Sequence, residues 1–224
     1  AKSFESTIER LTPFSGAGHP PMAREVLAEA WSRLAEERRV AGDEDGSMAA
    51  IEERGRIVDL LHNEFLDEPR YAVEVAEAIG LFTSQSNQFT LRAKESTEAE
   101  VSGNRILELI DGVLPALRAA SGDGEAEADL LARALETRTK ALLDLRRDAE
   151  AIGAMRECVE LRREAAARHP GVPRRRNELL TSLATLGASL RASGDPRGSV
   201  EALQEAASLR AIAIAREPDN KKLQ

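Results

Sequence analysis

The stretch that decides the fold is residues 179–218, LLTSLATLGASLRASGDPRGSVEALQEAASLRAIAIAREP. Its leucines first advance by four, three and four residues, at Leu179, Leu183, Leu186 and Leu190. That spacing places them on one face of a helix. The residues Ser-Gly-Asp-Pro at 193–196 then interrupt the pattern, because glycine adopts the left-handed conformation that ends a helix and Asp-Pro can open the next. A second helical pattern stops at Pro218, so the stretch predicts a hairpin of two antiparallel helices.

The same pattern occurs 48 residues earlier in the chain. Shifted by that distance, Leu161-Arg162 falls on Leu209-Arg210, and Pro170 falls on Pro218. Further upstream the agreement spans two helices and pairs Leu131 with Leu179, Leu135 with Leu183, Thr137 with Thr185, Leu142 with Leu190 and Met155 with Leu203. A fixed period indicates stacked copies of one helix pair.

Two earlier units follow from weaker patterns. Trp31, Leu34 and Ala35 reproduce the start of the first helix, and the residues Val-Ala-Gly-Asp that end at Asp43 resemble the later turn. The next unit is inferred from apolar residues over 71–82 and 101–117. Residues 83–97 are interpreted as a long polar turn, and Pro115 is expected to kink or break the second helix. We therefore divide the chain into a short N-terminal helix and linker, 1–21, and a helical repeat domain, 22–224, with units 22–69, 70–122, 123–170 and 171–218.

The last hairpin resembles the tetratricopeptide repeat (TPR) family. The residues at that family's spacing are Leu183, Leu186, Gly187, Leu190, Ser199, Leu203 and Ala206. Gly187 and Ser199 are the small residues where the two helices are expected to touch, because a small side chain lets helix backbones approach closely. The resemblance implies an all-α fold, a right-handed α-solenoid of about four stacked antiparallel helix hairpins. The period of 48 residues exceeds the ~34 that are usual in the family. It is similar to the long-helix variants of large bacterial signalling proteins.

The resemblance also implies a function in protein–protein interaction. Such a chain is expected to be a scaffold or adaptor, a fragment of a larger bacterial regulatory or signalling protein. It would bind a peptide or helix on the concave wall formed by the first helix of each pair. The family's groove-facing positions fall on Glu29, Ser32, Glu36, Arg39, Arg133, Glu136, Lys140, Thr181 and Arg191. Two alternatives stay open: a homodimeric all-helical sensor or bundle, and an all-helical enzyme whose site is assembled from distant carboxylates.

Composition and charge restrict the partners. Lys and Arg number 31 against 39 Asp and Glu, which gives a net charge of −8, and an acidic chain binds a phosphate backbone poorly. We therefore expect no nucleic acid. No apolar run approaches the roughly 20 residues that a membrane helix needs, so we expect no membrane association. The single cysteine cannot form an internal disulfide, which agrees with a cytoplasmic location, and basic charge carried mainly by Arg agrees with a bacterial source.

The chain shows no recognisable catalytic, cofactor or metal motif, so we expect no enzymatic activity, no cofactor and no metal. The three histidines, His19, His62 and His169, are scattered and are interpreted as solvated surface residues. Cys158 occupies a small-residue helix position and is interpreted as a packed thiol. The three arginines at 174–176 could bind an acidic peptide or a phosphate, but a solvated face between repeats explains them better.

The last predicted helix carries a wide apolar face. Ile212 and Ile214 extend this face, whereas the terminal helix of a solenoid should present a polar outer side. We therefore expect further repeats or a partner at this face. Self-association through the C-terminal helix is one form that such a contact could take.

Overall fold

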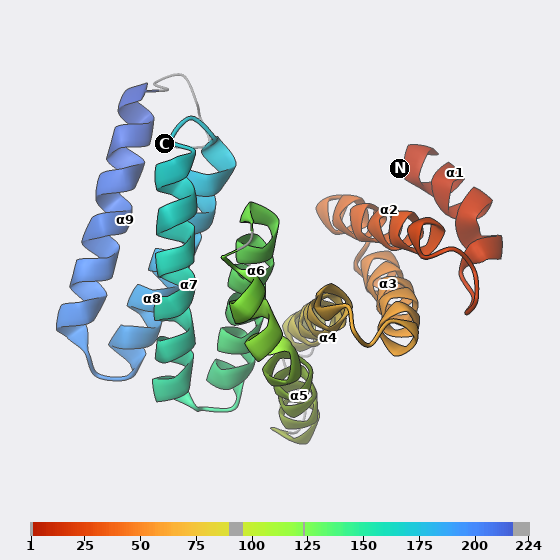
Figure 1. The fold of residues 1–224 in the computed structure, drawn as a ribbon, viewed down its shortest axis with the longest axis horizontal. Helices are drawn as coiled ribbons and strands as arrows, with labels where there is room; N and C mark the ends of the chain where they lie inside the picture. The colour runs from red at the N-terminus through yellow and green to blue at the C-terminus, as the bar shows by residue number, and fades with distance from the viewer. Residues whose placement is uncertain (1, 90–95, 123, 217–224) are drawn as a thin grey trace. The chain divides into compact units, whose positions relative to one another are not determined.

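The computed structural model describes residues 2–89, 96–122 and 124–216, and every regular element within these ranges is a helix (Figure 1). In chain order the elements are α1 (Lys2–Leu11), the short 3-10 helix η1 (Thr12–Phe14), α2 (Pro21–Val40), α3 (Glu44–Glu64), α4 (Pro69–Phe89), α5 (Ser96–Ala120), α6 (Glu125–Asp144), α7 (Asp148–Arg168), α8 (Pro173–Ala192) and α9 (Pro196–Arg216). The predicted all-α class is confirmed. None of the described helices is long and apolar enough to cross a membrane.

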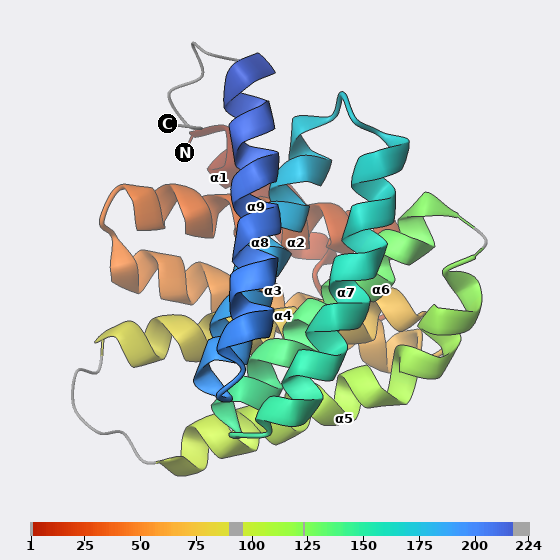
Figure 2. The same cartoon turned by 90° about the vertical axis from the view of Figure 1, so that its left-hand side faces the viewer.

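The helices form two compact units, Ala1–Val113 and Leu114–Gln224. In the first unit, α1 packs on α2, α2 on α3, and α3 on α4. In the second, α6 packs on α7, α7 on α8, and α8 on α9, and Figures 1 and 2 show these four helices side by side. Consecutive helices joined by short turns give each unit a TPR-like arrangement of hairpins. The boundaries of the four repeat units stay a prediction.

Two of the hairpins are closed by the same glycine turn. A left-handed residue ends the first helix of each, with φ +77° at Gly42 and +85° at Gly194. The N–H of the following residue donates to the carbonyl oxygen five positions earlier, at 2.9 Å for Asp43 and 2.8 Å for Asp195. Each of these aspartates also caps the next helix with its carboxylate. The sequence of residues 193–196 predicts that a glycine ends one helix and an aspartate caps the next, and both predictions are confirmed.

A third hairpin places Arg146 in the glycine position of this turn. Arg146 has φ 59°, and the N–H of Arg147 donates to Leu142 O at 2.8 Å, as in the other two turns. A side chain in the left-handed region costs about 1 kcal/mol relative to glycine. We expect Arg146→Gly to raise the free energy of unfolding by about 0.5 to 1 kcal/mol in urea denaturation. The matched control is Gly194→Arg, which should lower it by a similar amount, and equal stabilities of the two variants would contradict the prediction.

The leucine stripe of the last hairpin forms core, as predicted. All four leucines are buried: Leu179, Leu183, Leu186 and Leu190. Gly187 lies where α8 meets α9, because a Cβ at this position would come within 2.8 Å of Leu203 Cγ. Ser199, on the facing side of α9, is buried as well. The predicted close approach of the two helices at their small residues is confirmed.

One expectation for the second predicted unit is wrong, and another is narrowed. α4 continues to Phe89 and α5 begins at Ser96, so the polar turn predicted over 83–97 is wrong at both of its ends, while residues 90–95 lie outside the described ranges. The residues from 83 to 89 include neither Pro nor Gly, and polar side chains alone do not end a helix. Pro115 stands inside α5, which runs on to Ala120, so the predicted break is wrong and the kink stays a prediction.

Candidate partner-binding site on helices α6 and α8

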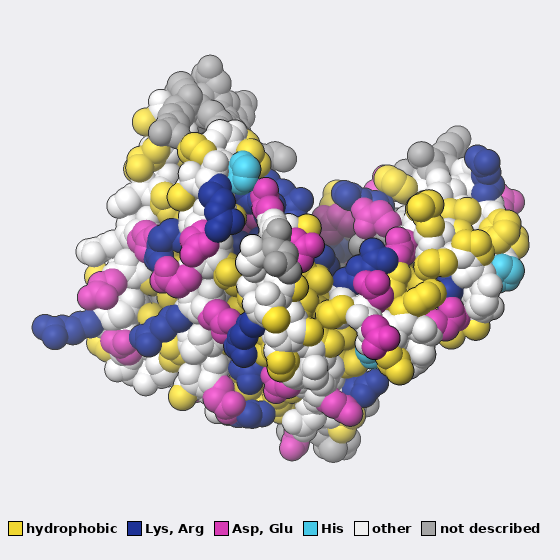
Figure 3. All heavy atoms as spheres, viewed as in Figure 1, with side chains coloured by type: hydrophobic (Ala, Val, Ile, Leu, Met, Phe, Trp, Pro, Cys, Tyr) yellow, Lys and Arg dark blue, Asp and Glu magenta, His cyan; other side chains and the backbone are white. Residues whose placement is uncertain are grey.

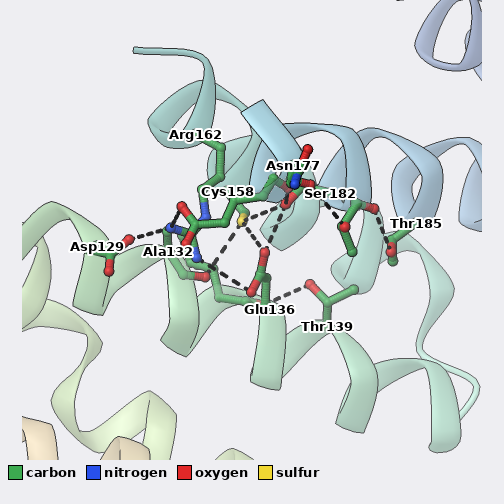
Figure 4. A network of polar contacts seen from close by, with 12 residues as sticks. Asp129, Ala132, Glu136, Thr139, Cys158, Arg162, Asn177, Ser182 and Thr185 are labelled. Carbon is green, nitrogen blue, oxygen red and sulfur yellow. Dashed lines mark hydrogen bonds and ion pairs between the residues drawn. The ribbon is translucent and has the colours of Figure 1, made fainter. Parts of the chain in front are cut away.

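Helices α6, α7 and α8 meet in a network of polar side chains (Figure 4). At its centre is Arg162 of α7, whose side chain is only 4% exposed. The guanidinium binds Asp129 of α6, binds Glu178 of α8 at 3.0 Å, and lies 3.6 Å from Glu136 of α6. One buried cation therefore holds carboxylates from two other helices.

Arg175, in the first turn of α8, adds a second link to α6. It binds Asp129 Oδ1 at 2.7 Å and Glu178 Oε2 at 3.1 Å. Burial raises the pKa of Asp129, but the charge of Arg162 and the hydrogen bond from Arg175 outweigh burial, so the net shift of this pKa is downward. Arg174 and Arg175 thus contribute to an ion-pair network between helices. Their interpretation as a solvated face is wrong for Arg175, whose side chain is 14% exposed.

Cys158 lies inside the same junction. Its Sγ is 3.5 Å from Ala132 O and 3.7 Å from both Glu136 Oε1 and Ser182 Oγ. Burial, aided by the negative charge of Glu136, raises the pKa of the thiol to about 12. The thiol therefore stays protonated at neutral pH, and its interpretation as a packed side chain is confirmed.

The three histidines do not share one environment. His19 is exposed and makes a T-shaped ring contact with Phe14. His169, which follows α7, is 41% exposed, and its Nε2 lies 3.0 Å from Glu125 Oε2. His62 on α3 is half-buried, and its Nδ1 is shielded from solvent without a hydrogen-bond partner in the described part of the chain. The solvated-surface interpretation is therefore wrong for His62. In the same part of the chain, no group of His, Cys, Asp or Glu side chains could hold a metal ion.

An open groove of about 680 Å³ runs along α8 beside the end of α6. Its lining consists mostly of small and apolar side chains: Leu143 of α6 and Leu180, Thr181, Ala184, Thr185, Ala188, Ser189 and Ala192 of α8. The hydroxyls of Thr181 and Thr185 donate to carbonyl oxygens within α8, so their hydrogen-bonding capacity is used inside the helix. Small side chains along a helix let another helix or an extended peptide approach its backbone closely.

Two cations border this groove. Lys140 lies one turn before Leu143 on α6, and Arg191 directly precedes Ala192 on α8. Both side chains are exposed, and neither forms an ion pair within the described residues. On the face drawn in Figure 3, acidic and basic side chains lie among one another, as the magenta and dark blue spheres show. The groove is therefore an apolar surface with a basic border.

Four of the nine predicted partner-binding residues lie on α2 in the first unit. Glu29 binds Arg33 at 2.6 Å, and Glu36 binds Arg39 at 2.7 Å, both as exposed pairs within the helix. The hydrogen bond from Arg39 lowers the pKa of Glu36. Ser32 is half-buried. These side chains lie on the surface of α2, and their role in binding stays a prediction.

The other five predicted residues lie on α6 and α8 in the second unit. Thr181 lines the groove, and Lys140 and Arg191 border it. Arg133 is half-buried on α6. Glu136 turns into the junction, where it accepts a hydrogen bond from the Ser182 hydroxyl at 2.8 Å. The structure thus places one of the five in the lining of the groove and two close to lining residues along the same helices, and their role in binding stays a prediction.

Sequence reasoning missed the small residues that form most of the groove. Ala184 and Ala188 are both exposed and stand four residues apart on α8. Their spacing could have indicated a shared surface, because positions four residues apart lie on the same face of a helix, and the buried leucines occupy a different face. An alanine carries no polar group, however, so nothing in its chemistry distinguishes a binding surface from ordinary helix-forming sequence.

A comparable link joins α2 to the start of α4 in the first unit. Arg70 binds Glu25 Oε1 at 2.8 Å, and the Tyr71 hydroxyl donates to the same oxygen at 2.5 Å. Burial and the hydrogen bond to Glu25 raise the pKa of Tyr71 to about 12. In each unit, a carboxylate near the start of one helix therefore accepts hydrogen bonds from side chains at the start of the second helix after it. Glu25 of α2 accepts them from α4, and Asp129 of α6 accepts one from Arg175 of α8.

No family model matches the chain, and no curated protein matches it. Among solved structures, the chain is similar to BtubC (BKLC) from P. vanneervenii, with 19% identity, a TM-score of 0.45 and coverage of 95% of this chain and 90% of that one. It is also similar to MamA from Desulfovibrio magneticus RS-1, with 17% identity, a TM-score of 0.32 and coverage of 82% and 95% of the two chains. The assignment of the fold rests on the helices and their packing in the structure itself.

Proposed function

We propose that this chain is a protein-binding scaffold or adaptor whose partner lies in the groove on α6 and α8. The observation that carries this proposal is the open apolar groove of about 680 Å³ with Lys140 and Arg191 on its border. An open surface of this kind suits a peptide segment or one face of a helix. The small side chains would contact the apolar side of the partner, and the two cations would attract its acidic residues.

We further propose that the groove belongs to the concave wall of a long-helix TPR-like solenoid in a cytoplasmic bacterial regulatory or signalling protein. The lining comes from α6 and α8, the first helices of two successive hairpins, which is the wall that the TPR resemblance implies. The homodimeric bundle and self-association through α9 are the alternatives. Light scattering over a range of protein concentrations separates them, since a constant monomer mass contradicts both.

We propose binding and not catalysis as the role of this chain. The Cys158 thiol is buried, and its pKa is raised to about 12, which makes it a poor nucleophile. The enclosed carboxylates of Asp129 and Glu178 are held by arginines on neighbouring helices. These groups serve the junction of three helices.

Ala188→Arg is expected to weaken partner binding at least tenfold, about 1.4 kcal/mol, because it places a long charged side chain in the apolar groove. The tagged protein captures partners from cell extract, mass spectrometry identifies them, and each purified partner is titrated against wild type and variant. Lys140→Glu with Arg191→Glu should weaken the same partners and reduce the dependence of their affinity on salt.

Arg156→Glu is the matched control for these variants. Arg156 is exposed on α7 and does not line the groove, so its reversal should leave the affinity unchanged. Circular dichroism establishes that all variants keep the helical fold. Partners that bind Ala188→Arg as tightly as wild type would place the binding surface elsewhere and overturn the proposal.

A further inference from the structure

Helix α9 repeats the sequence positions of α7, and three of its residues are exposed where the matching residues of α7 are buried, although Leu203 also contacts Gly187 of α8 on one side. With the shift of 48 residues, three positions pair as follows: Met155 with Leu203, Val159 with Ala207, and Arg162 with Arg210. The α7 members of these pairs are 2%, 2% and 4% exposed, in that order. All three α9 members are exposed, Leu203 to 44%. The same positions are therefore covered in one helix and open in the other.

Helix α8, which follows α7 in the chain, packs against α7. This helix buries a stripe of leucines, and its Ser182 stands beside the α7 residue Cys158 with Oγ and Sγ 3.7 Å apart. Its Glu178 binds the buried Arg162 at 3.0 Å. Helix α8 thus supplies a small residue beside Cys158 and a carboxylate to Arg162, and it carries a buried leucine stripe.

The open face of α9 is continuous and mostly apolar. Val200 is 52% exposed, Leu203 is 44% exposed, and Ala207 and Ala211 are exposed at the following turns. Their spacing of three and four residues places them on one side of the helix. Figure 2 looks at the second unit from the side of α9, and no other helix of this unit lies in front of α9 in this view. Ile212 is also exposed but lies on another side of α9, so it is not part of this face.

We propose that this face of α9 docks an amphipathic helix of the same kind as α8, supplied by a partner protein. The partner helix places leucines over Leu203 and Ala207 and a carboxylate beside Arg210, where Glu178 of α8 binds the matching Arg162 of α7. A second copy of this chain does not offer such a helix, because the leucine stripes of α6 and α8 are buried within the fold: Leu131, Leu135 and Leu142, and Leu179, Leu183, Leu186 and Leu190. The surface is separate from the groove on α6 and α8.

The probe is a fluorescent peptide with the sequence of residues 173–192, the extent of α8. In the peptide, Lys and Asp replace Ala184 and Ala188, and condensation of their side chains forms a lactam brace that keeps the peptide helical, because an isolated helix of this length is only marginally stable in water. Both positions are exposed in α8, so the brace leaves the leucine face free. Fluorescence anisotropy should show saturable binding to the intact protein. Ala207→Arg should weaken this binding at least tenfold, since the matching residue of α7 is 2% exposed.

Ser208→Arg is the matched control. Ser208 is exposed, and its counterpart on α7, Glu160, is exposed as well, so this variant should bind the peptide within about twofold of wild type. A charge exchange tests the carboxylate: Arg210→Glu should weaken the unmodified peptide and restore binding of the peptide that carries Glu178→Arg. The groove variant Ala188→Arg should bind the peptide as wild type does, so that failure here is distinguishable from failure of the proposed groove.

Three outcomes overturn the inference. The braced peptide could show no saturable binding, or Ala207→Arg and Ser208→Arg could weaken it equally. The protein alone could also form a dimer that Ala207→Arg dissociates, in which case the face joins two copies of this chain and not a partner helix. Light scattering without peptide measures the last outcome.

Discussion

Arg162→Met lowers the free energy of unfolding of the second unit by about 3 kcal/mol, because it removes the cation from a buried group of carboxylates. The Arg162 side chain is 4% exposed, and the side chains of Asp129 and Glu178 on either side are 19% and 18% exposed. Methionine keeps much of the length of the side chain, so the loss reflects charge more than an empty cavity. Arg175 still binds both carboxylates, which places the expected loss at the lower end of the range for buried ion pairs. Urea denaturation followed by circular dichroism measures it.

The control is Arg168→Ala on the same helix. Arg168 is 56% exposed and binds Glu164 within the helix, so its removal should cost less than about 1 kcal/mol. Equal losses in the free energy of unfolding for Arg162→Met and Arg168→Ala would show that the buried ion pairs of Arg162 contribute no more to stability than an exposed pair does.

The effect of Arg162→Met also depends on pH in a defined direction. The pKa of Asp129 is lowered in the folded protein, so its ion pairs contribute stability above the unfolded pKa of about 3.9, and this contribution is lost as the pH falls through the lower folded value. The stability difference between wild type and Arg162→Met is therefore expected to be largest at neutral pH and to shrink in acid. A difference that grows towards acid contradicts this account.

The second large effect is expected in the first unit, at Arg24. Its side chain is fully buried, and it binds the two carboxylate oxygens of Glu64 at 2.9 and 2.6 Å and the carbonyl oxygen of His19 at 2.9 Å. Arg24→Leu removes the link between the start of α2, the end of α3 and the linker before α2. We expect a loss of about 2 kcal/mol, because the charged hydrogen bonds of a buried guanidinium are lost, while the Glu64 carboxylate, whose side chain is 27% exposed, can be solvated by water.

Tryptophan fluorescence reports this change selectively. Trp31 is the single tryptophan of the chain and packs against Ala35, Ala50 and Ile51 in the first unit. The urea midpoint seen by fluorescence should fall for Arg24→Leu and stay near that of wild type for Arg33→Ala, an exposed arginine of the same helix paired with Glu29. An unchanged midpoint for Arg24→Leu would mean that the link to Glu64 contributes little to folding.

Local features of the last hairpin could be predicted from sequence because each has a residue-level signature. Leucine spacing identifies the buried stripe of α8, Gly194 identifies the left-handed turn, and Asp195 identifies the helix cap. Gly187 marks the close approach to α9. These signals depend on neighbours within one or two turns, so one chain suffices to interpret them.

Features that join distant helices could not be predicted in the same way. Arg175 and Asp129 are separated by 46 residues, and which charges meet depends on the register between helices. Arg146 adopts the conformation of a glycine without any signature, because the turn geometry of the hairpin imposes it. Thr139 stands 48 residues before Gly187, is fully buried and donates to Leu135 O at 2.7 Å, so its hydroxyl is satisfied inside the helix.

The buried position of Cys158 allows local opening of the second unit to be measured by thiol labelling. It is the only cysteine of the chain, and it is enclosed where α6, α7 and α8 meet. A thiol reagent can reach it only when those helices separate, so the rate of labelling in the native protein counts separation events at this junction. This measurement therefore needs no engineered cysteine.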